Sequence, residues 1–166
     1  MMSVPDITLR PTSGDDLDFV LGAEGDPANS QFIGSWSREE HGEAISHSKY
    51  FHLLILQNQQ PVGYLIAIDL QDQKQGVFLK RIVVSMKGKG VGRQAIVAFI
   101  ESLTLMQPCN LWLAVDAENT RARRTYEALG FDEKPVLGDQ RAQLDMAVGG
   151  FPESSLLMFK GLCPPD

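Results

Sequence analysis

The sequence predicts one α/β (α+β) domain, with a mixed, mostly antiparallel central sheet of about seven strands flanked by about four helices. Three apolar runs between residues 51 and 84 are separated only by short polar turns, so these strands must be antiparallel neighbours. A glycine-rich turn and a long amphipathic helix then lead to the next apolar run, which the crossover makes parallel to the strand before it. No repeat or low-complexity linker interrupts the chain, so we expect a single domain over 1–166.

The first part of the chain is predicted to form one strand and two helices. Residues 7–11 alternate apolar and polar side chains and end at a proline. Ser13, followed closely by two aspartates, predicts a helix start. Ser37, with a glutamate three positions later, predicts a second helix that runs to about His47. Between the two helices we expect a loop over 24–36.

The rest of the chain is predicted to alternate strands with helices. Apolar residues at i, i+3, i+4 and i+7 predict a long helix after the glycine-rich turn, and Gly130 is a natural residue to end a second helix that begins near Asn119. We interpret 138–153 as a loop with some strand. The strands expected here are 51–56, 62–68, 77–84, 111–115, 131–136 and 156–159.

Composition and charge narrow the class of protein. Apolar residues make up 43% and charged residues 22%, as in ordinary globular domains, and the net charge of −6 argues against general nucleic-acid binding. No apolar run reaches membrane-spanning length, and the first residues lack a basic-then-apolar signal. The two cysteines, Cys109 and Cys163, have neither metal-ligand spacing nor a disulfide-rich context. We therefore expect a cytoplasmic protein with no metal, nucleic-acid or membrane partner.

The most informative segment is the basic, glycine-rich turn that follows the strand over 77–84. Alternate glycines let a ligand approach the backbone N–H groups, and the following helix adds its unpaired N–H groups and the positive end of its dipole. Three basic side chains add full charges at the same place. We interpret the turn as a polyanion site, best suited to a pyrophosphate. Its residues are Lys87, Gly88, Lys89, Gly90, Val91, Gly92 and Arg93.

Other phosphate-binding patterns fit this turn less well. Gly90 to Ala95 match G-x-G-x-x-A, and Asp116 ends the next strand as a ribose-binding acid does. A small dinucleotide-binding oxidoreductase domain is therefore an alternative, although the antiparallel strands before the turn and the short chain after Asp116 argue against it. The turn also lacks the Gly-Lys-Ser/Thr of phosphate-loop NTPases.

A second motif narrows the ligand further. Asn119-x-x-Ala122-x-x-x-Tyr126-Glu127-x-x-Gly130-Phe131 lies on a predicted helix that places Asn119, Ala122 and Tyr126 on one face. Together with the glycine-rich turn, it resembles the two ordered signatures of the GNAT acyl-CoA N-acyltransferases. The predicted element order resembles that fold over almost the entire chain. The strand ending in Arg81-Ile82-Val83-Val84 looks most like the ribosomal-protein N-terminal acetyltransferase branch.

This resemblance implies direct transfer of acetyl from acetyl-CoA to a primary amine in a ternary complex. The turn would bind the CoA pyrophosphate, the backbone of the preceding strand would pair with the pantetheine arm, and Asn119 would contact the pantetheine region. Tyr126 would protonate the departing thiolate, which suits a phenol that is neutral at pH 7. Plain structural roles stay open, with Tyr126 in the core and Asn119 as a helix cap. The expected cofactor-binding residues are Ile82, Val83, Val84, Lys87, Gly88, Lys89, Gly90, Val91, Gly92, Arg93, Asn119 and Ala122.

The same resemblance places the acceptor site at the first two helices and their loop. Phe32, Trp36 and Tyr64 are the expected apolar walls, although Trp36 is more often a packing anchor. One of three glutamates, Glu24, Glu39 or Glu40, could attract the ammonium group of the acceptor. The acceptor itself is left open between a protein N-terminus, a polyamine, an amino sugar and an antibiotic.

The sequence assigns no general base. Many relatives carry a glutamate on the strand that matches 77–84, where this chain has only Lys80 and Arg81 as ionisable residues. His41 follows two glutamates on a predicted helix, where a solvated histidine is the favoured reading. Because no base is assigned, a non-catalytic CoA-binding regulatory module remains an alternative. A homodimer through the C-terminal strands is also compatible with the sequence. The remaining candidates for a base are Asp69, Asp116 and Glu118.

Overall fold

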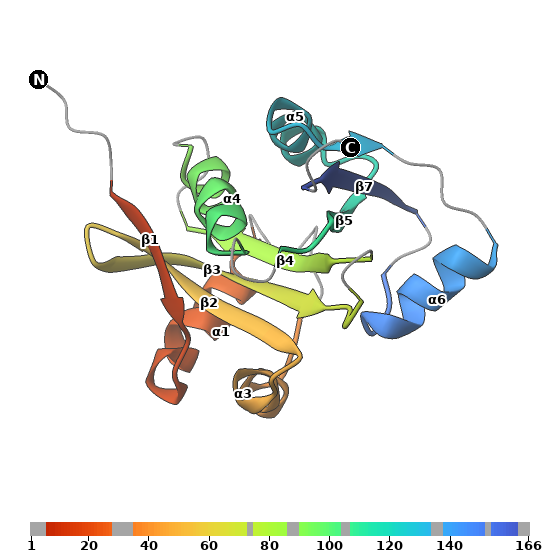
Figure 1. The fold of residues 1–166 in the computed structure, drawn as a ribbon. Helices are drawn as coiled ribbons and strands as arrows, with labels where there is room; N and C mark the ends of the chain where they lie inside the picture. The colour runs from red at the N-terminus through yellow and green to blue at the C-terminus, as the bar shows by residue number, and fades with distance from the viewer. Residues whose placement is uncertain are drawn as a thin grey trace, which may run out of the picture. The chain divides into compact units, whose positions relative to one another are not determined.

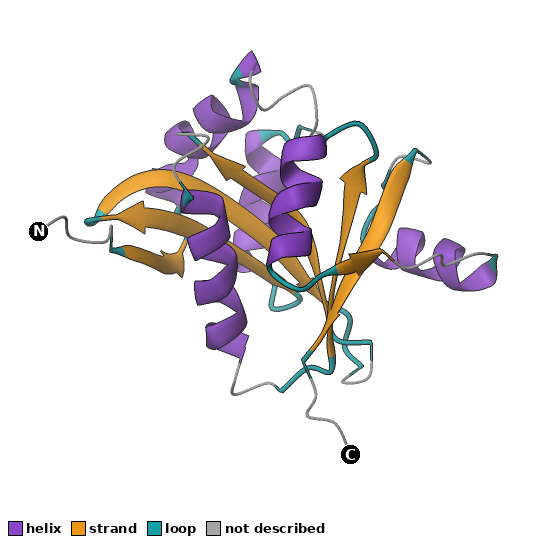
Figure 2. Ribbon diagram, turned by 90° about the horizontal axis from the view of Figure 1, so that it is seen from above, coloured by secondary structure: helices purple, strands orange, loops and turns teal. Residues whose placement is uncertain are grey.

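The computed structural model of this protein describes residues 6–27, 35–72, 75–85, 90–103, 107–133, 138–151 and 154–162. Its strands form a seven-stranded sheet in the order β1-β2-β3-β4-β5-β7-β6, which confirms the predicted mixed α/β class (Figure 1). Helices and strands can be followed along the chain in Figure 2. The elements are β1 (Ile7–Pro11), the 3-10 turn η1 (Gly14–Asp16), α1 (Leu17–Gly25), α3 (Arg38–Ser46), β2 (Tyr50–Gln57), β3 (Gln60–Asp69), β4 (Val77–Val84), α4 (Val91–Ser102), β5 (Asn110–Asp116), α5 (Thr120–Ala128), β6 (Asp132–Glu133), α6 (Asp139–Ala147) and β7 (Ser155–Gly161).

The chain divides into two compact units, each described below by itself. The first unit comprises Met1–Ala67 and Arg81–Ser102, and the second comprises Ile68–Lys80 and Leu103–Asp166. The prediction of one acetyltransferase domain over 1–166 stays a prediction.

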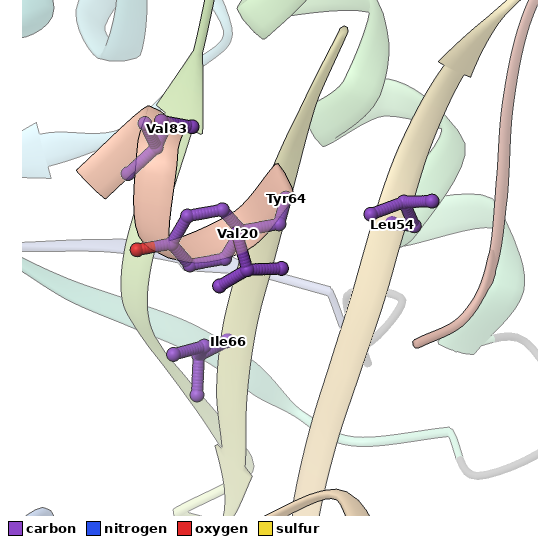
Figure 3. Close-up of a cluster of buried hydrophobic side chains, with 6 residues drawn as sticks. Val20, Leu54, Tyr64, Ile66 and Val83 are labelled. Carbon is purple, nitrogen blue, oxygen red and sulfur yellow. The ribbon is translucent and has the colours of Figure 1, made fainter. Parts of the chain in front are cut away.

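Alternate side chains of the first unit's strands enter two separate apolar clusters. Leu54 and Val83 pack with Val20 of α1, on the side of the strands where α1 and α3 lie (Figures 1 and 3). Ile55 instead packs with Val91 of α4, which covers the other side. Because successive side chains of a strand point to opposite faces, one set packs in a cluster with α1 and the other in a cluster with α4.

The strand β3 changes this alternation at Gly63. Val62 packs in the cluster on the α4 side, whereas Tyr64 and Ile66 pack in the cluster on the α1 side. Val62 and Tyr64 are two residues apart and would share a face in a regular strand. Their opposite orientation means that one extra residue is inserted near Gly63, as in a β-bulge. A Cβ at Gly63 would lie 2.2 Å from the carbonyl oxygen of Val83. Glycine is therefore required for the close approach of the β3 and β4 backbones.

The predicted antiparallel hairpins are present. The strand β1 is antiparallel to β2, from Ile7 opposite Gln57 to Pro11 opposite Leu53. The two turn residues between β2 and β3 have positive φ angles of 50° and 70°, as a two-residue hairpin turn of the primed type requires. Since that turn is tighter than predicted, Pro61 lies in β3 and not in the turn.

Hydrogen bonds at both ends show that β3 and β4 also run in opposite directions. The Leu70 N–H group donates to the Gly76 oxygen at the connecting turn, and the Ser85 N–H group donates to the Val62 oxygen at the other end. Along β3 from Val62 to Leu70, the position of the partner in the sequence falls from Ser85 to Gly76. Only an antiparallel pair gives this order.

In the second unit, β5 joins a parallel and an antiparallel neighbour. Residues 77–79 of β4 pair in parallel with 111–113, which confirms the parallel relation expected from the helical crossover. The entire length of β5 pairs antiparallel with β7, and β6 pairs with the outer edge of β7. Trp112 and Phe159 stack across the β5–β7 pair with ring centroids 5.5 Å apart.

The helix α6 overturns the interpretation of 138–153 as a loop with some strand. None of its residues is buried, so its sequence has no apolar stripe of helical period to reveal it. Its C-terminal end is held by polar contacts. The Lys80 ammonium donates to the Val148 oxygen at 2.6 Å, and the Phe151 N–H group donates to Asp145 Oδ1 at 2.9 Å.

Two findings bear on the expected location. Among the residues that the structure describes, no helix is long and apolar enough to cross a membrane. Cys109, next to β5, is disulfide-bonded. A reducing compartment does not predict such a bond, and the cytoplasmic location stays a prediction.

Gly63→Ala is expected to lower the free energy of unfolding by about 2–3 kcal/mol, because the added Cβ meets a backbone oxygen and not a flexible side chain. Urea denaturation with fitted m-values measures this change. Gly22→Ala in α1 is the matched control, since nothing lies within 4 Å of its added Cβ. We expect that control to be as stable as the wild type or up to about 1 kcal/mol more stable. Equal stability of the two variants would refute the close-approach argument.

Candidate active site

A buried carboxylate in the first unit collects four hydrogen bonds. Glu24, near the end of α1, is only 3% exposed. Its Oε2 atom accepts from Arg81 Nη1 at 2.9 Å, from His41 Nε2 at 2.7 Å and from the Tyr64 hydroxyl at 2.8 Å. Its Oε1 atom accepts from the backbone N–H group of Trp36 at 2.7 Å. We call these five residues the Glu24 cluster.

These donors keep Glu24 ionised. Desolvation by burial raises the pKa of the carboxyl, but the hydrogen bonds from His41, Trp36 and Tyr64 and the positive charge of Arg81 outweigh it, so the pKa lies below its ordinary value. The Glu24–Arg81 pair is buried at both ends and is hydrogen-bonded, which is the condition under which an ion pair is tolerated inside a protein.

A chain of two histidines leads away from this carboxylate. His41 Nδ1 lies 3.0 Å from His52 Nε2, and His52 Nδ1 lies 2.9 Å from the hydroxyl oxygen of Thr12. Because an ionised Glu24 can only accept, His41 Nε2 must donate to it. When His41 is neutral, its Nδ1 accepts from His52 Nε2, and His52 Nδ1 accepts from the Thr12 hydroxyl. Every bond of the neutral chain then points toward Glu24.

His52 is neutral in this chain. Burial is the main cause that lowers its pKa to about 4, and positive charge on His41, when that ring is protonated, and on Arg81 acts in the same direction. His52 was not among the residues predicted from the sequence, although a histidine within the apolar run of β2 was a signal that pointed to it.

Two expectations about the acceptor side are wrong, those for His41 and Glu24. His41, interpreted as a solvated histidine, is completely buried. Glu24 already binds four donors, so it is not free to attract an ammonium group. Tyr64 is completely buried with its hydroxyl on Glu24, and its contact with an acceptor stays a prediction. Glu40 caps α3 in the predicted capping box with Ser37.

Trp36 and Phe32 remain as the other expected acceptor contacts. Trp36 is half-buried, and its ring lies 5.2 Å from the Arg81 guanidinium and 5.3 Å from the His41 ring. The packing role that the sequence analysis favoured for Trp36 is therefore present, and its contact with an acceptor stays a prediction. Phe32 lies outside the described residues.

The described part of the glycine-rich turn begins at Gly90, while Lys87, Gly88 and Lys89 lie outside the described residues. Gly90 has a φ of +76°, which side chains rarely adopt, and a Cβ there would have open space, with Gln94 Nε2 at 3.9 Å as the nearest atom. The helix α4 starts at the next residue, so its first-turn N–H groups have no partner within the helix. Arg93 is exposed in that first turn. This open, glycine-led helix start suits an anion.

The side chains of residues 82–84 pack in the two apolar clusters of the first unit. Val83 is buried in the α1-side cluster, while Ile82 and Val84 are half-buried against the α4-side cluster. The parallel register of β4 with β5 ends at Leu79 and Leu113, whereas β4 continues to Val84.

The helix α5 holds its two motif residues in the structural roles that the sequence analysis left open. The Asn119 side chain caps α5 by accepting from the Ala122 N–H group at 3.3 Å. Tyr126 is 9% exposed and its ring packs edge-on against Phe131. Desolvation by burial raises the pKa of Tyr126 to about 12, so its phenol keeps its proton at neutral pH.

Two of the candidate bases, Asp69 and Asp116, accept hydrogen bonds from the backbone of their own turns. Asp69 Oδ1 accepts from the Gln71 N–H group, and Asp116 Oδ1 accepts from the Glu118 N–H group, each at 2.8 Å in a turn. Within the described ranges, no group of three or more histidine, cysteine, aspartate or glutamate side chains is placed to hold a metal ion.

The strands β2 to β5, the glycine-led start of α4 and the motif on α5 all lie within one stretch of sequence that matches a known family. Residues 24–131, more than half of the chain, match the family described as "Acetyltransferase (GNAT) family". The protein therefore belongs to the GNAT acetyltransferase family, which confirms the resemblance noted in its sequence.

Solved structures show the same fold at low sequence identity. The chain is similar to the ribosomal-protein-S18-alanine N-acetyltransferase from Escherichia coli, with a TM-score of 0.71, 20% identity and 97% of each chain covered. It is also similar to the PaiA N-acetyltransferase from Thermoplasma acidophilum in complex with coenzyme A, with a TM-score of 0.70, 16% identity and coverage of 94% of this chain and 99% of that one. The chain is similar as well to the spermidine N-acetyltransferase from Vibrio cholerae in complex with CoA and spermine. That structure has a TM-score of 0.72 and 19% identity, with coverage of 94% of this chain and 95% of that one. No curated protein sequence matched the chain.

His52→Gln is expected to flatten the loss of stability on acidification. In the wild type the unfolded histidine binds a proton near its ordinary pKa of 6.5, whereas the folded one resists protonation down to about 4. The unfolded state therefore binds more protons in this window, and the free energy of unfolding falls as the pH falls, by on the order of 2–3 kcal/mol. Glutamine keeps a donor and an acceptor but does not titrate.

Urea denaturation of both proteins at several values between pH 4 and 7 measures this difference. The other charged or titratable groups around His52, which are His41, Glu24, Arg81 and Tyr64, are the same in both proteins. Parallel stability curves for the wild type and the variant would show that His52 is not held neutral.

Proposed function

We propose that this protein is an acetyl-CoA-dependent N-acetyltransferase that moves acetyl directly to a primary amine within a ternary complex. The observation that carries the proposal is the family match over 24–131, which includes β4, the glycine-rich turn, α4, β5 and α5 in one run. The coenzyme in two of the similar structures supports acetyl-CoA as the donor. The names of two similar proteins, a ribosomal-protein-alanine N-acetyltransferase and a spermidine N-acetyltransferase, support an amine acceptor.

The glycine-rich turn is proposed to bind the pyrophosphate of the donor. The N–H groups of the first turn of α4 donate to the phosphate oxygens, where the helix dipole also favours negative charge. The positive φ of Gly90 supports this, since it opens the turn at the start of the helix. Lys87, Lys89 and Arg93 add charge, and Gly88 adds a further bare backbone N–H group. Together these groups account for donor binding without a metal.

The pantetheine arm is proposed to pair with the backbone of Ile82, Val83 and Val84. The end of the β4–β5 register at Leu79 supports this assignment. Asn119 contacts the pantetheine region in addition to capping α5, and the small side chain of Ala122 permits close approach.

Tyr126 is proposed to donate its phenolic proton to the sulfur as the thioester bond breaks. A bond forms between the amine nitrogen and the acetyl carbon, a backbone N–H group near Val84 donates to the carbonyl oxygen, and the sulfur leaves with its electron pair. The proton that the nitrogen releases balances the one that Tyr126 gives up, by way of solvent. The raised pKa of Tyr126 supports this role, because the phenol still carries its proton at pH 7.

One observation favours a second candidate function, a CoA-binding module without catalysis. The ionisable residues of β4 are both engaged, Arg81 with Glu24 and Lys80 with the Val148 oxygen. Neither is placed to act as a general base.

An acceptor screen with acetyl-CoA distinguishes these functions. The panel contains peptides with free N-termini, polyamines, amino sugars and aminoglycosides, and released thiol is the readout. Acetyl transfer to at least one amine supports the proposed function. Binding of acetyl-CoA without transfer to any acceptor favours the regulatory module, and a thermal shift with NAD(H) or NADP(H) alone favours the oxidoreductase alternative.

Tyr126→Phe is expected to lower the turnover number at least ten-fold with little change in affinity for acetyl-CoA, because only the donated proton is removed. Steady-state kinetics and calorimetry measure the two quantities. Tyr50→Phe, which removes a hydroxyl from β2, is the control and should leave both unchanged. Normal turnover of Tyr126→Phe would remove the assignment of Tyr126 as the acid.

Gly90→Glu is expected to abolish CoA binding, because the new side chain brings bulk and negative charge to the start of α4. Gly138→Glu is the matched control, since Gly138 also has a positive φ of 66° with open space around its added Cβ. It tests backbone strain and charge away from the turn, and it should bind CoA normally. Unchanged affinity of Gly90→Glu in calorimetry would show that the turn does not bind the phosphates.

A further inference from the structure

We propose that Glu24 is a positioning residue for acetyl transfer. Its carboxylate holds Trp36 at the start of α3 and Arg81 of β4 in one arrangement, and through them it sets the affinity for the acceptor amine without touching it. This inference rests on the proposed function, including the acceptor contact of Trp36, and it falls with that function.

The first support is the way in which the Glu24 cluster anchors Trp36. The backbone N–H group of Trp36 donates to Glu24 Oε1, while its ring lies over the Arg81 guanidinium that Glu24 Oε2 binds. Backbone and side chain of this tryptophan therefore depend on the same carboxylate. A change at Glu24 must alter both.

The second support is the place of Arg81 in β4. Arg81 is 7% exposed and directly precedes Ile82–Val84, the backbone proposed to pair with the donor. The Glu24–Arg81 ion pair thus connects the segment proposed for the acceptor with the segment proposed for the donor. Both segments belong to the first unit.

The third support is that only a carboxylate suits this position. All four partners donate to the Glu24 carboxylate, and one of them, Arg81, also brings a full positive charge. A glutamine at position 24 would bring its own N–H groups against these donors and would leave Arg81 without a counter-charge. Trp36 and the Arg81 side chain are then expected to move, while the backbone of β4, which pairs with β3 in the sheet, is expected to stay in place.

Glu24→Gln tests the proposal, with Glu39→Gln as the matched control because Glu39 is exposed on α3 and loses the same charge. We expect Glu24→Gln to raise the KM for the amine identified in the screen at least ten-fold. The Kd for acetyl-CoA should stay within three-fold, and hydrogen exchange at the Trp36 amide should become at least ten-fold faster. The control should match the wild type in all three measurements.

Glu24→Asp keeps the proposal testable if Glu24→Gln does not fold. Aspartate retains the charge beside Arg81 but is one methylene too short to keep all four contacts, so the same changes are expected at smaller size. An unchanged KM for the amine in a folded variant would overturn the positioning role, as would a proportional loss of amine and acetyl-CoA affinity. Absence of acetyl transfer by the wild type would instead overturn the proposed function.

Discussion

The buried ion pair between Glu24 and Arg81 is the interaction on which the first unit depends. Two charges out of water stay stable only while each is paired and hydrogen-bonded, and removing one partner of such a pair typically costs about 3–5 kcal/mol. The pair also recruits His41 of α3 and Tyr64 of β3, so one carboxylate joins helices and strands from four parts of the chain. A buried network whose hydrogen bonds are all satisfied adds to apolar packing by favouring one arrangement of α1 and α3 against the strands.

Most of the fold could be predicted because its signals are local. Short turns imply antiparallel neighbours, the helical crossover implies the parallel β4–β5 pair, and the serine–glutamate spacing at Ser37 implies the start of α3. The helix α6 could not be found in this way, since a helix that buries none of its residues leaves no period in the sequence. The place of β7 between β5 and β6 is also a long-range fact that no local pattern records.

The candidate site also contains parts that local sequence patterns predict and parts that they do not. The glycine-rich turn and the motif from Asn119 to Phe131 are compact in sequence, so their spacing was enough to suggest a ligand. The Glu24 cluster joins residues between 12 and 57 positions apart, and its members look ordinary one at a time. His41 seemed exposed because two glutamates precede it, yet Ala44, three residues later, shares its buried face. A histidine and a small apolar residue at helical spacing were the available signal.

The irregularity of β3 at Gly63 has an evolutionary consequence. Before this glycine, the even-numbered residue Val62 faces the α4 side of the sheet, whereas after it the even-numbered residues Tyr64 and Ile66 face the α1 side. A single-residue insertion or deletion at this point would move the side chains of the remainder of the strand from the apolar cluster on one face to the cluster on the other. Differences in chain length should therefore accumulate in the hairpin turn at 58–59 and not within residues 62–66, even where individual side chains there are replaced.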